Sequence, residues 1–407
     1  MLILASIFSF IVSLIIFIIV LSVLVLFHEL GHFLFARKVG IRVEEFAFGF
    51  PPRLWTIKKG ETNYTINAIP IGGYVKMYGE NLEDYGKKTP QSKRAFWAKS
   101  KMARTLVIVA GVVFNFLLAI ICFSFVYSVV GIPVETGKIE IAAVFPGSPA
   151  EQAGLLPGDV LDSIDNINLS SLTPTEALNN FSNEITTKKG QVVTIVINRA
   201  SDNPCLNNDN QQVSESINCQ NGKIILTVIP RVDFPAGEGP TGVAIQAGIE
   251  NIHYPLWQMP FRGAKQGLLE AVGWGQQIIN SLKTMVSDIV IKGIAPQDVG
   301  GPIVIFQVTS QVARTGIINT LQLLGILSVN LAIINILPIP ALDGGRLVFI
   351  IYELITRRRP KPEIENWVNS VGFSLLILLI IVISVNDLNR ILDFGSIFSQ
   401  FKSILHF

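Results

Sequence analysis

Three residues in one short stretch have the types and the spacing to bind a metal ion and to use it for hydrolysis. His28, Glu29 and His32 form the pattern HExxH. On a helix, positions i and i+4 lie on the same face, so both imidazole rings can reach one Zn²⁺ ion. Glu29 would then be near enough to a metal-bound water to act as its general base. The pattern therefore predicts a zinc metalloprotease.

The stretch closes an apolar run that is long enough to cross a membrane. Residues 2–27 contain no charged side chain. An ionisable group in lipid costs about 2.5 kcal/mol or more and usually has a function, which disfavours a mere pair of core histidines. Arg37 and Lys38 mark the expected cytoplasmic boundary, so the site is expected roughly 8–14 Å inside the membrane. Other spans must then enclose a polar cavity that admits water.

A catalytic zinc site has three protein ligands and one open position. The other two histidines, His253 and His406, lie in the expected external domain and at the C-terminus. The best third ligand is Asp343, within NILPIPALDGGR (335–346). The prolines of this stretch end a helix and its two glycines let the chain turn, so the carboxylate can point back toward the zinc. The alternative is an aspartate that only caps a helix.

Composition and charge indicate a membrane protein. Of 407 residues, 50% are hydrophobic and 15% are charged, and the mean hydropathy is +0.49. Four windows have the length of a span. The first has no basic n-region and no cleavage site, so it is expected to be retained rather than removed as a signal peptide. The windows are 5–27 (continuing as a helix to 37), 105–130, 316–337 and 369–385.

Basic residues predict the topology. Segment 37–104 has 14 basic and 6 acidic residues, whereas 131–304 has 10 basic and 17 acidic residues. The positive-inside rule therefore puts loops 38–104 and 346–365 in the cytoplasm, and the N-terminus and the long segment outside. The net charge of +2 gives no indication of nucleic-acid binding.

Residues 62–79, TNYTINAIPIGGYVKMYG, read as a short β-hairpin after the first span. A substrate span must unwind before hydrolysis, and its freed backbone groups then need partners. A hairpin edge offers them by strand addition, which makes Gly72, Gly73 and Tyr74 candidate substrate-binding residues. A plain cytoplasmic hairpin is the alternative. Asn115, in the second span, either joins helices or contributes to the site.

These motifs together resemble the site-2 protease family of intramembrane zinc metalloproteases, in its bacterial RseP-like (regulator of sigma-E protease) branch. The likeness rests on HExxH and NxxPxPxxDGG, with AGVVFNFLLA (110–119), IPIGGYVKM (69–77) and GGPIVIFQ (300–307). It implies one Zn²⁺ per chain on His28, His32 and Asp343, with Glu29 as base. It also implies a membrane-reentrant β-loop, and Asn335 as a residue that holds the substrate strand.

Segment 136–247 resembles a circularly permuted bacterial PDZ domain, through SPAEQAGL and PGDVLDSID. The resemblance implies a peptide-binding loop at Gly242, Val243, Ala244 and Ile245. Such a domain either binds a chain end or only blocks access to the membrane site. Cys205 and Cys219 lie in a polar insertion between two strand-like runs. A disulfide between them is expected in an oxidising compartment, and two free thiols are the alternative.

The fold expected is a polytopic α-helical membrane protein with about four transmembrane helices, a membrane-reentrant β-hairpin and one extracytoplasmic PDZ-like α+β domain. Residues 1–130 and 315–407 would form the membrane core. Residues 248–314 would form an amphipathic segment, either on the outer membrane surface or packed under the PDZ-like domain.

The function expected is an intramembrane zinc endopeptidase of a bacterial inner membrane. It would cut single-span membrane proteins near the cytoplasmic face, after a first cut by another protease, as the resemblance implies. Anti-sigma factors and remnant signal peptides are substrates of the expected kind. A CaaX-type zinc protease also uses HExxH, but with a glutamate as third ligand and no PDZ segment. The non-enzymatic alternative is a PDZ-bearing membrane scaffold with a structural or inactive metal site.

Overall fold

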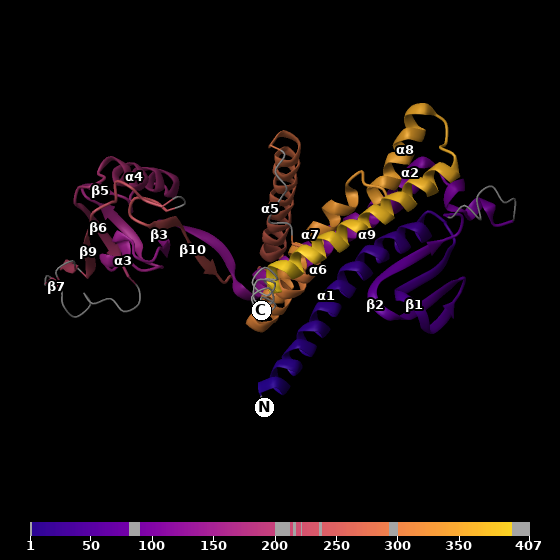
Figure 1. Cartoon of the computed structure of the whole chain (residues 1–407), viewed down its shortest axis with the longest axis horizontal. Coiled ribbons are helices and arrows are strands. Elements are labelled where there is room, and N and C mark those ends of the chain that lie inside the picture. Colours follow the sequence, from indigo (N-terminus) through magenta and orange to yellow (C-terminus); the bar gives the residue numbers. More distant parts are fainter. Residues whose placement is uncertain are drawn as a thin grey trace, which may run out of the picture. The chain divides into compact units, whose positions relative to one another are not determined.

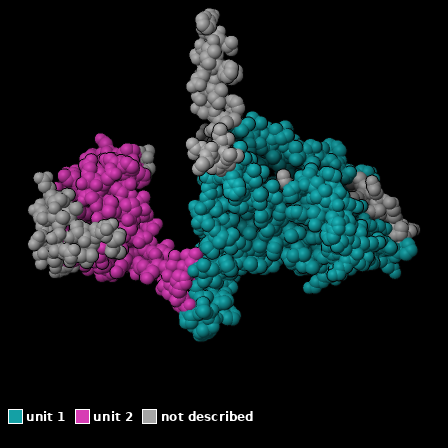
Figure 2. Space-filling model, turned by 90° about the horizontal axis from the view of Figure 1, so that it is seen from below, with its two compact units in different colours: residues 1–129, 255–407 teal, residues 130–254 magenta. Residues whose placement is uncertain are grey.

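The computed structural model describes residues 2–80, 90–199, 212–214, 217–220, 222–235, 238–292 and 300–392. The chain divides into two compact units (Figure 2). Residues 1–129 and 255–407 form a membrane unit, and residues 130–254 form a sheet unit. The sheet unit is thus one continuous insertion in the chain of the membrane unit.

Helices dominate the membrane unit and strands the sheet unit (Figure 1). The helices are α1 (Leu2–Lys38), α2 (Lys101–Val130), α3 (Pro149–Gln152), α4 (Pro174–Thr187), α5 (Met259–Ser287), α6 (Pro302–Thr315), α7 (Ile317–Ile336), α8 (Asp343–Thr356) and α9 (Pro362–Leu392). Short 3-10 helices cover Ser92–Arg94 and Phe96–Ala98, and a π-helix covers Asp288–Lys292. The strands are β1 (Val43–Lys59), β2 (Thr62–Met77), β3 (Ile132–Val144), β4 (Val160–Ile164), β5 (Ile167–Asn168), β6 (Val193–Asn198), β7 (Gln212–Ser214), β8 (Ile217–Gln220), β9 (Lys223–Val228) and β10 (Val243–Ile252).

Four of the described helices are long and apolar enough to cross a membrane, as predicted. They cover Ile7–Lys38, Lys101–Val130, Ile317–Ile336 and Glu363–Leu388, within α1, α2, α7 and α9. Many of their large apolar side chains are exposed, for example Phe8 at 70% and Phe373 at 57%. Such an outer surface is stable only when lipid covers it. We therefore treat these helices as the membrane spans.

The spans pack around α2, which has the most buried residues among them. Val20 and Leu24 of α1 meet Leu118 and Cys122 of α2 and Leu324 of α7 in one apolar cluster. A second cluster joins α2 to α5 and α7 through Phe123, Ala271 and Val329. This packing brings the C-terminal half of α1, where HExxH lies, against α2.

The membrane unit also contains a small sheet made of β1 and β2. Each strand bends near its middle, so the sheet has four arms, in the order 53–59, 62–69, 43–50 and 73–77. The order follows from Glu45, which pairs with Asn63 on one side and with Lys76 on the other. The hairpin predicted within 62–79 is corrected here, because arm 43–50 lies between its two halves. The two prolines and the charges of 43–59 hide the alternation of this partner strand.

Segment 248–314 contains two helices, and both pack among the spans. Along α5, Gly263, Gly267 and Ala271 are buried at helical spacing, and the first two lie against Ser128 and Ser124 of α2. Small residues at this spacing let two helix backbones approach closely. Farther along, α5 lines an apolar cavity of about 530 Å³ with Ile333 of α7 and with Leu337, the residue after α7. This packing of α5 along α2 and α7 was not predicted.

Helix α6 packs against α1 through Phe306, whose ring meets Phe10 and Phe17 edge-on. Asp387 of α9, which is fully buried, accepts hydrogen bonds from the backbone N–H groups of Gly301 and Val304 at 3.3 Å each. It satisfies donors that the first turn of a helix leaves without a partner. The start of α6 is therefore tied to the last span.

The sheet unit contains one mainly antiparallel sheet in the order β10-β3-β4-β6-β9-β8-β7, with β5 paired to β4. Its core is apolar, and α4 packs across it with Ala177, Phe181 and Ile185. Thr173 and Glu176 form a capping box that begins α4. β10 is an edge strand, and its last residue, Ile252, pairs with Ile132, the first residue of β3.

Candidate metal centre

Two predicted ligands come from one face of α1. His28 and His32 are each 8% exposed, and their rings meet nearly at right angles with centroids 4.7 Å apart. The spacing of four residues puts them one helical turn apart on the side that faces α2. The Nε2 atoms of the two rings lie 3.1 Å from each other. Both rings therefore present the same nitrogen to one point.

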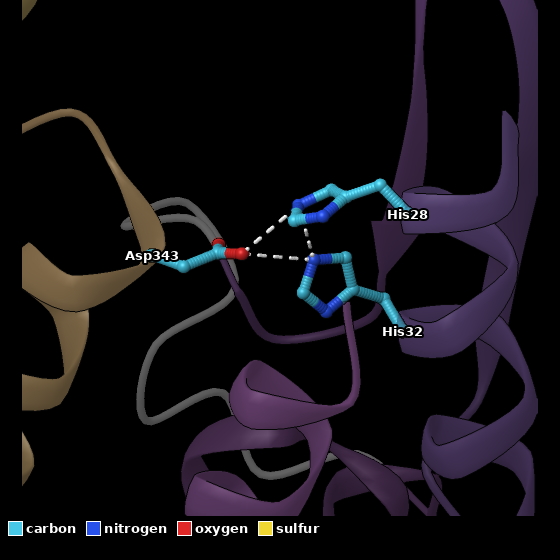
Figure 3. A group of neighbouring side chains, drawn as sticks. All are labelled: His28, His32 and Asp343. Carbon is cyan, nitrogen blue, oxygen red and sulfur yellow. Dashed lines mark hydrogen bonds and ion pairs between the residues drawn. The ribbon is translucent and has the colours of Figure 1, made fainter. Parts of the chain in front are cut away.

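The third predicted ligand comes from the loop between α7 and α8. Asp343 is the first residue of α8, and its carboxylate points at the two rings (Figure 3). The loop before it is tight. A Cβ on Gly344 would lie 1.9 Å from the carbonyl oxygen of Leu337, so only glycine fits. This turn directs Asp343 toward α1.

The three groups form a nearly regular triangle. Asp343 Oδ2 lies 3.0 Å from His28 Nε2 and 3.1 Å from His32 Nε2. Ligand atoms about 2.0–2.1 Å from a tetrahedral Zn²⁺ are about 3.3 Å apart, which is close to these separations. Among the described residues, these three are the His, Cys, Asp and Glu side chains that gather with a geometry suited to a metal ion.

A backbone contact shows which nitrogen of His32 is available. His32 Nδ1 lies 2.8 Å from the carbonyl oxygen of Val107 on α2. A carbonyl only accepts, so Nδ1 carries the proton and Nε2 keeps its lone pair in the neutral ring. Asp343 Oδ2 is buried and has no donor in hydrogen-bonding geometry. In this tautomer His32 Nε2 and the carboxylate of Asp343 both direct lone pairs to the space between them, which is the arrangement that a cation requires.

The role of Val107 was not predicted, because a carbonyl acts here and no side-chain pattern reveals it. Gly111, within the AGVVFNFLLA stretch, is a second such residue. A Cβ on Gly111 would lie 2.5 Å from His32 Nε2 and 2.8 Å from His28 Cε1. The signal that the sequence offered was a glycine within the second span. A glycine there lets the backbone of one helix come close to the side chains of another.

The two predicted asparagines both reach His28. Asn115 is fully buried, and its Nδ2 lies 3.2 Å from His28 Nδ1. Asn335 is 9% exposed, and its Nδ2 lies 3.5 Å from His28 Nε2. α2 and the end of α7 thus each supply an amide to the centre.

The β1/β2 sheet meets the centre at Glu29. A Cβ built on Gly73 would lie 3.6 Å from Glu29 Cγ, so the edge arm 73–77 passes beside this carboxylate. Gly72 has a positive φ of 101° and lies against the ring of Phe50. The ring of Tyr74 stacks on Phe50 at 6.5 Å. Of the three predicted substrate residues on this sheet, Gly73 is thus the one that lies against the HExxH pattern.

Two other groups of predicted residues lie in the sheet unit. Gly242 has a φ of 72°, and Val243, Ala244 and Ile245 begin β10 and pair with β3. Cys219 is buried on β8 and takes part in a disulfide. Cys205 lies outside the described residues, so the pairing of these two cysteines stays a prediction.

Comparison with known proteins gives consistent relatives over most of the chain. A protein of Clostridium perfringens named "Putative zinc metalloprotease CPE1693" is 32% identical over 371 residues, which cover 90% of this chain and 96% of the relative. The zinc metalloprotease RasP of Geobacillus kaustophilus is 29% identical, with 93% of this chain and 98% of the relative covered. The regulator of sigma-W protease RasP of Bacillus subtilis is 26% identical, with coverages of 94% and 99%.

Residues 16–379 match the model of peptidase family M50. The match includes HExxH, the second span, the sheet unit and Asp343, and it confirms the resemblance drawn from the motifs. The chain therefore belongs to peptidase family M50, the zinc metalloproteases of the site-2 protease type.

Proposed function

We propose that this chain binds one Zn²⁺ through His28, His32 and Asp343 and cuts membrane-spanning segments near their cytoplasmic ends. The observation that carries the proposal is the triangle of three ligand atoms at 3.0–3.1 Å, buried between spans. Three protein ligands leave one position open, as a catalytic zinc requires and a structural zinc does not. The three-ligand set therefore disfavours the scaffold with a structural metal.

Bound zinc would supply Lewis acidity and lower the pKa of a coordinated water. Glu29 follows His28 directly in the chain, and its carboxylate faces the arm 73–77. In this role Glu29 accepts a proton from the attacking water and then delivers it to the leaving amine. Asn335 Nδ2, beside His28, is in place to donate to a substrate carbonyl.

The substrate is a membrane span that has unwound locally. Arm 73–77 pairs with 43–50 on one side, and among the described residues no strand pairs with its other side. An extended substrate would add to this edge, and its backbone groups would find partners there. Gly73, with no side chain, leaves room between the edge and Glu29.

The sheet is suited to insertion into the membrane from the cytoplasmic side. Its bend at Pro70 lies against the middle of α1, where Ser22 Oγ donates to the carbonyl of Pro70 at 3.3 Å. Near this level Phe50, Leu54 and Ile69 are 47%, 68% and 46% exposed. Apolar side chains exposed at mid-span depth are stable in lipid and not in water. These contacts support a reentrant sheet.

The basic loops support a topology with 38–104 and 346–365 in the cytoplasm and the sheet unit outside. In this topology His28 and His32 lie nearer the cytoplasmic end of α1 than its N-terminus. A cut there would release the cytoplasmic part of a substrate.

The sheet unit fits a PDZ-like domain. β10 is an edge strand, α4 packs near both β10 and β3, and Gly242 is the last residue of the loop that leads into β10. An edge strand beside a helix is the arrangement by which such domains take up a chain end. A bulky domain outside the membrane would also exclude substrates with intact external domains. Substrates shortened by another protease are therefore the ones expected.

The test compares wild type, Glu29→Gln and Glu61→Gln in detergent, with a single-span substrate whose external part is reduced to a short stub. Zinc content and product are measured in the same samples. Wild type and both variants should each bind about one zinc. Glu29→Gln should cut about 10²–10⁴-fold more slowly, whereas Glu61→Gln, the same change at an exposed site, should cut normally. Zinc-loaded wild type that cuts no stub substrate would refute the proposal.

A parallel assay with the same span carrying a folded external domain tests the exclusion by the sheet unit. The stub should be cut and the long form should not. Equal rates for the two forms would remove the proposed size restriction while leaving the protease itself intact.

A further inference from the structure

Asn115 is the buried polar side chain at the centre that the proposed reaction leaves without a task. It is fully buried on α2, and its Nδ2 lies 3.2 Å from His28 Nδ1. Its Oδ1 is also buried and has no hydrogen-bond partner. A buried amide oxygen without a partner costs about 1–3 kcal/mol. Such an atom in the interior of a protein calls for an explanation.

The two ends of an asparagine amide differ in chemistry but hardly in shape, and their assignment follows from the surrounding hydrogen bonds. His28 faces Asp343 and His32 with its Nε2. If that nitrogen keeps its lone pair in a neutral ring, the proton is on Nδ1, and Nδ1 is a donor. Opposite this donor an oxygen is required, and an NH₂ group would repel it.

We propose that Asn115 acts as a positioning residue, with its Oδ1 accepting the hydrogen bond of His28 Nδ1–H, so that Nε2 is held ready as a metal ligand. Turning the amide by half a turn puts Oδ1 in the place of Nδ2, 3.2 Å from His28 Nδ1. The same turn gives the oxygen a donor and moves Nδ2 to the position where Oδ1 had no partner. This inference rests on the proposed function, because it assumes that His28 ligates the metal.

The pair of ligands then has matching support from one helix. His32 Nδ1 donates to the backbone carbonyl of Val107, and His28 Nδ1 donates to the side chain of Asn115, both on α2. Histidine ligands commonly give their second N–H to an acceptor, which fixes the tautomer and the direction of the ring. Ser328 Oγ donates to the backbone carbonyl of Asn115 at 2.7 Å. This bond joins the backbone of α2 to α7 and does not involve the side-chain amide.

The competing role of Asn115, as a residue that only joins α2 to α7, predicts different variants. Asn115→Asp keeps an acceptor opposite His28 and loses the donor. Asn115→Leu keeps the approximate volume and loses both. Ser328→Ala removes the hydrogen bond between α2 and α7 and leaves the amide in place, which makes it the matched control for helix joining.

The measurement is the zinc dissociation constant of each detergent-purified full-length variant, from competition with a chelator at neutral pH. Asn115→Leu should weaken zinc binding about 10–100-fold, the usual effect of removing an acceptor behind a ligand. Asn115→Asp and Ser328→Ala should bind zinc as wild type does, within about threefold. If Asn115→Asp is as weak as Asn115→Leu, or if Ser328→Ala weakens binding as much as Asn115→Leu, the positioning role is wrong.

A second measurement is independent of affinity and applies to any variant that folds. The chain has four histidines, so ¹⁵N-histidine spectra of the metal-loaded protein can be assigned with His28→Ala and His32→Ala references. The expected result is a protonated Nδ1 on His28 in wild type and in Asn115→Asp. A wild-type His28 ligating through Nδ1 would overturn the inference. Wild type that binds no zinc at all would instead overturn the proposed function on which the inference rests.

Discussion

In the sheet unit the interior is a continuous apolar cluster, with Leu161, Ile195 and Leu226 fully buried, whereas the interior of the membrane unit holds many polar groups. Buried polar side chains there include His28, His32, Arg104, Asn115, Ser328, Asn335, Glu353 and Asp387. The outer surface of the membrane unit is apolar as well, because many leucine, isoleucine and phenylalanine side chains of the spans are exposed. In water, burial of apolar area drives folding. In lipid it contributes little between helices, so close packing and satisfied polar groups take its place.

The difference between the two interiors bears on where a functional site can form. Polar residues inside a span must be paired, because an unpaired one is costly. Such pairing is seen along the helices: Arg104 pairs with Glu353 at 2.6 Å, and Asp387 caps α6. The candidate ligands thus belong to an interior in which buried polar groups find partners. The sheet unit has fewer buried polar side chains among its described residues (Ser148, Asp159 and Thr241) and has an edge strand at β10.

The largest effect is expected from Asp343→Asn, which removes the carboxylate of the candidate metal centre and leaves the sheet unit unchanged. The variant keeps the volume but loses the anionic ligand between His28 and His32. Zinc binding should weaken by more than the ~100-fold typical of a supporting residue, and cleavage should disappear. Chelator competition and the substrate assay measure both. Normal zinc affinity in this variant would remove Asp343 from the ligand set.

The second prediction concerns the sheet unit and not the membrane unit: Leu161→Ala removes an apolar side chain from the core of the sheet unit. Leu161 is fully buried on β4, so truncation should destabilise this unit by about 2–5 kcal/mol. Zinc affinity should stay within about twofold of wild type, because the ligands belong to the other unit. Limited proteolysis within 130–254 during heating, together with zinc binding, tests the independence of the two. Parallel losses of both would show that the units are energetically coupled.

A third substitution tests whether close packing of helices, and not burial of apolar area, stabilises the membrane unit. A side chain on Gly267 would lie 2.5 Å from Ser124 Oγ and 2.6 Å from its backbone nitrogen. Gly267→Leu should therefore push α5 from α2 and destabilise the membrane unit by about 1–3 kcal/mol. Gly273→Leu, on the same helix with open space at its Cβ, is the matched control and should be neutral or stabilising. Thermal unfolding in detergent compares them, and equal melting temperatures would contradict the packing.

The smallest effect concerns a charge pair at the turn between β1 and β2. A hydrogen bond from Arg94 lowers the pKa of the Glu61 carboxyl. A carboxyl with a lowered folded-state pKa stabilises the fold above its unfolded pKa, and this contribution is lost as the pH falls. Both side chains are exposed, so Glu61→Gln should cost less than about 1 kcal/mol at pH 7.

Chemical unfolding of wild type and Glu61→Gln at several pH values provides the measurement. The gap between them should be widest near neutral pH and should close below about pH 4, where the free carboxyl takes up its proton. A gap that persists in acid would assign the effect to packing and not to charge.

The sequence was most informative where a pattern is local. Uncharged runs predicted four spans, and the spacing of HExxH predicted that His28 and His32 share a face. The prolines and glycines of 335–346 indicated a turn, and the structure has that turn. These signals need only a few neighbouring residues, because helix periodicity and backbone restrictions act over short distances.

What could not be predicted depends on contacts between distant segments. The arm 43–50 lies between the two halves of β2, and no rule of alternation specifies strand order. The small residues of α5 weaken its helical signal, yet they are the ones that contact α2. Val107 acts through its carbonyl, which every residue has. Long-range pairing of this kind is determined by the assembled fold and not by one segment.

The ligands come from opposite ends of the chain, and this has a consequence for biosynthesis. His28 and His32 are made with the first span, whereas Asp343 follows the whole sheet unit and α5 to α7. A ribosome-bound chain therefore holds an incomplete ligand set until its late helices have entered the membrane. If these three residues bind the metal as proposed, the order of synthesis delays the onset of proteolysis until Asp343 and the helices before it have been made.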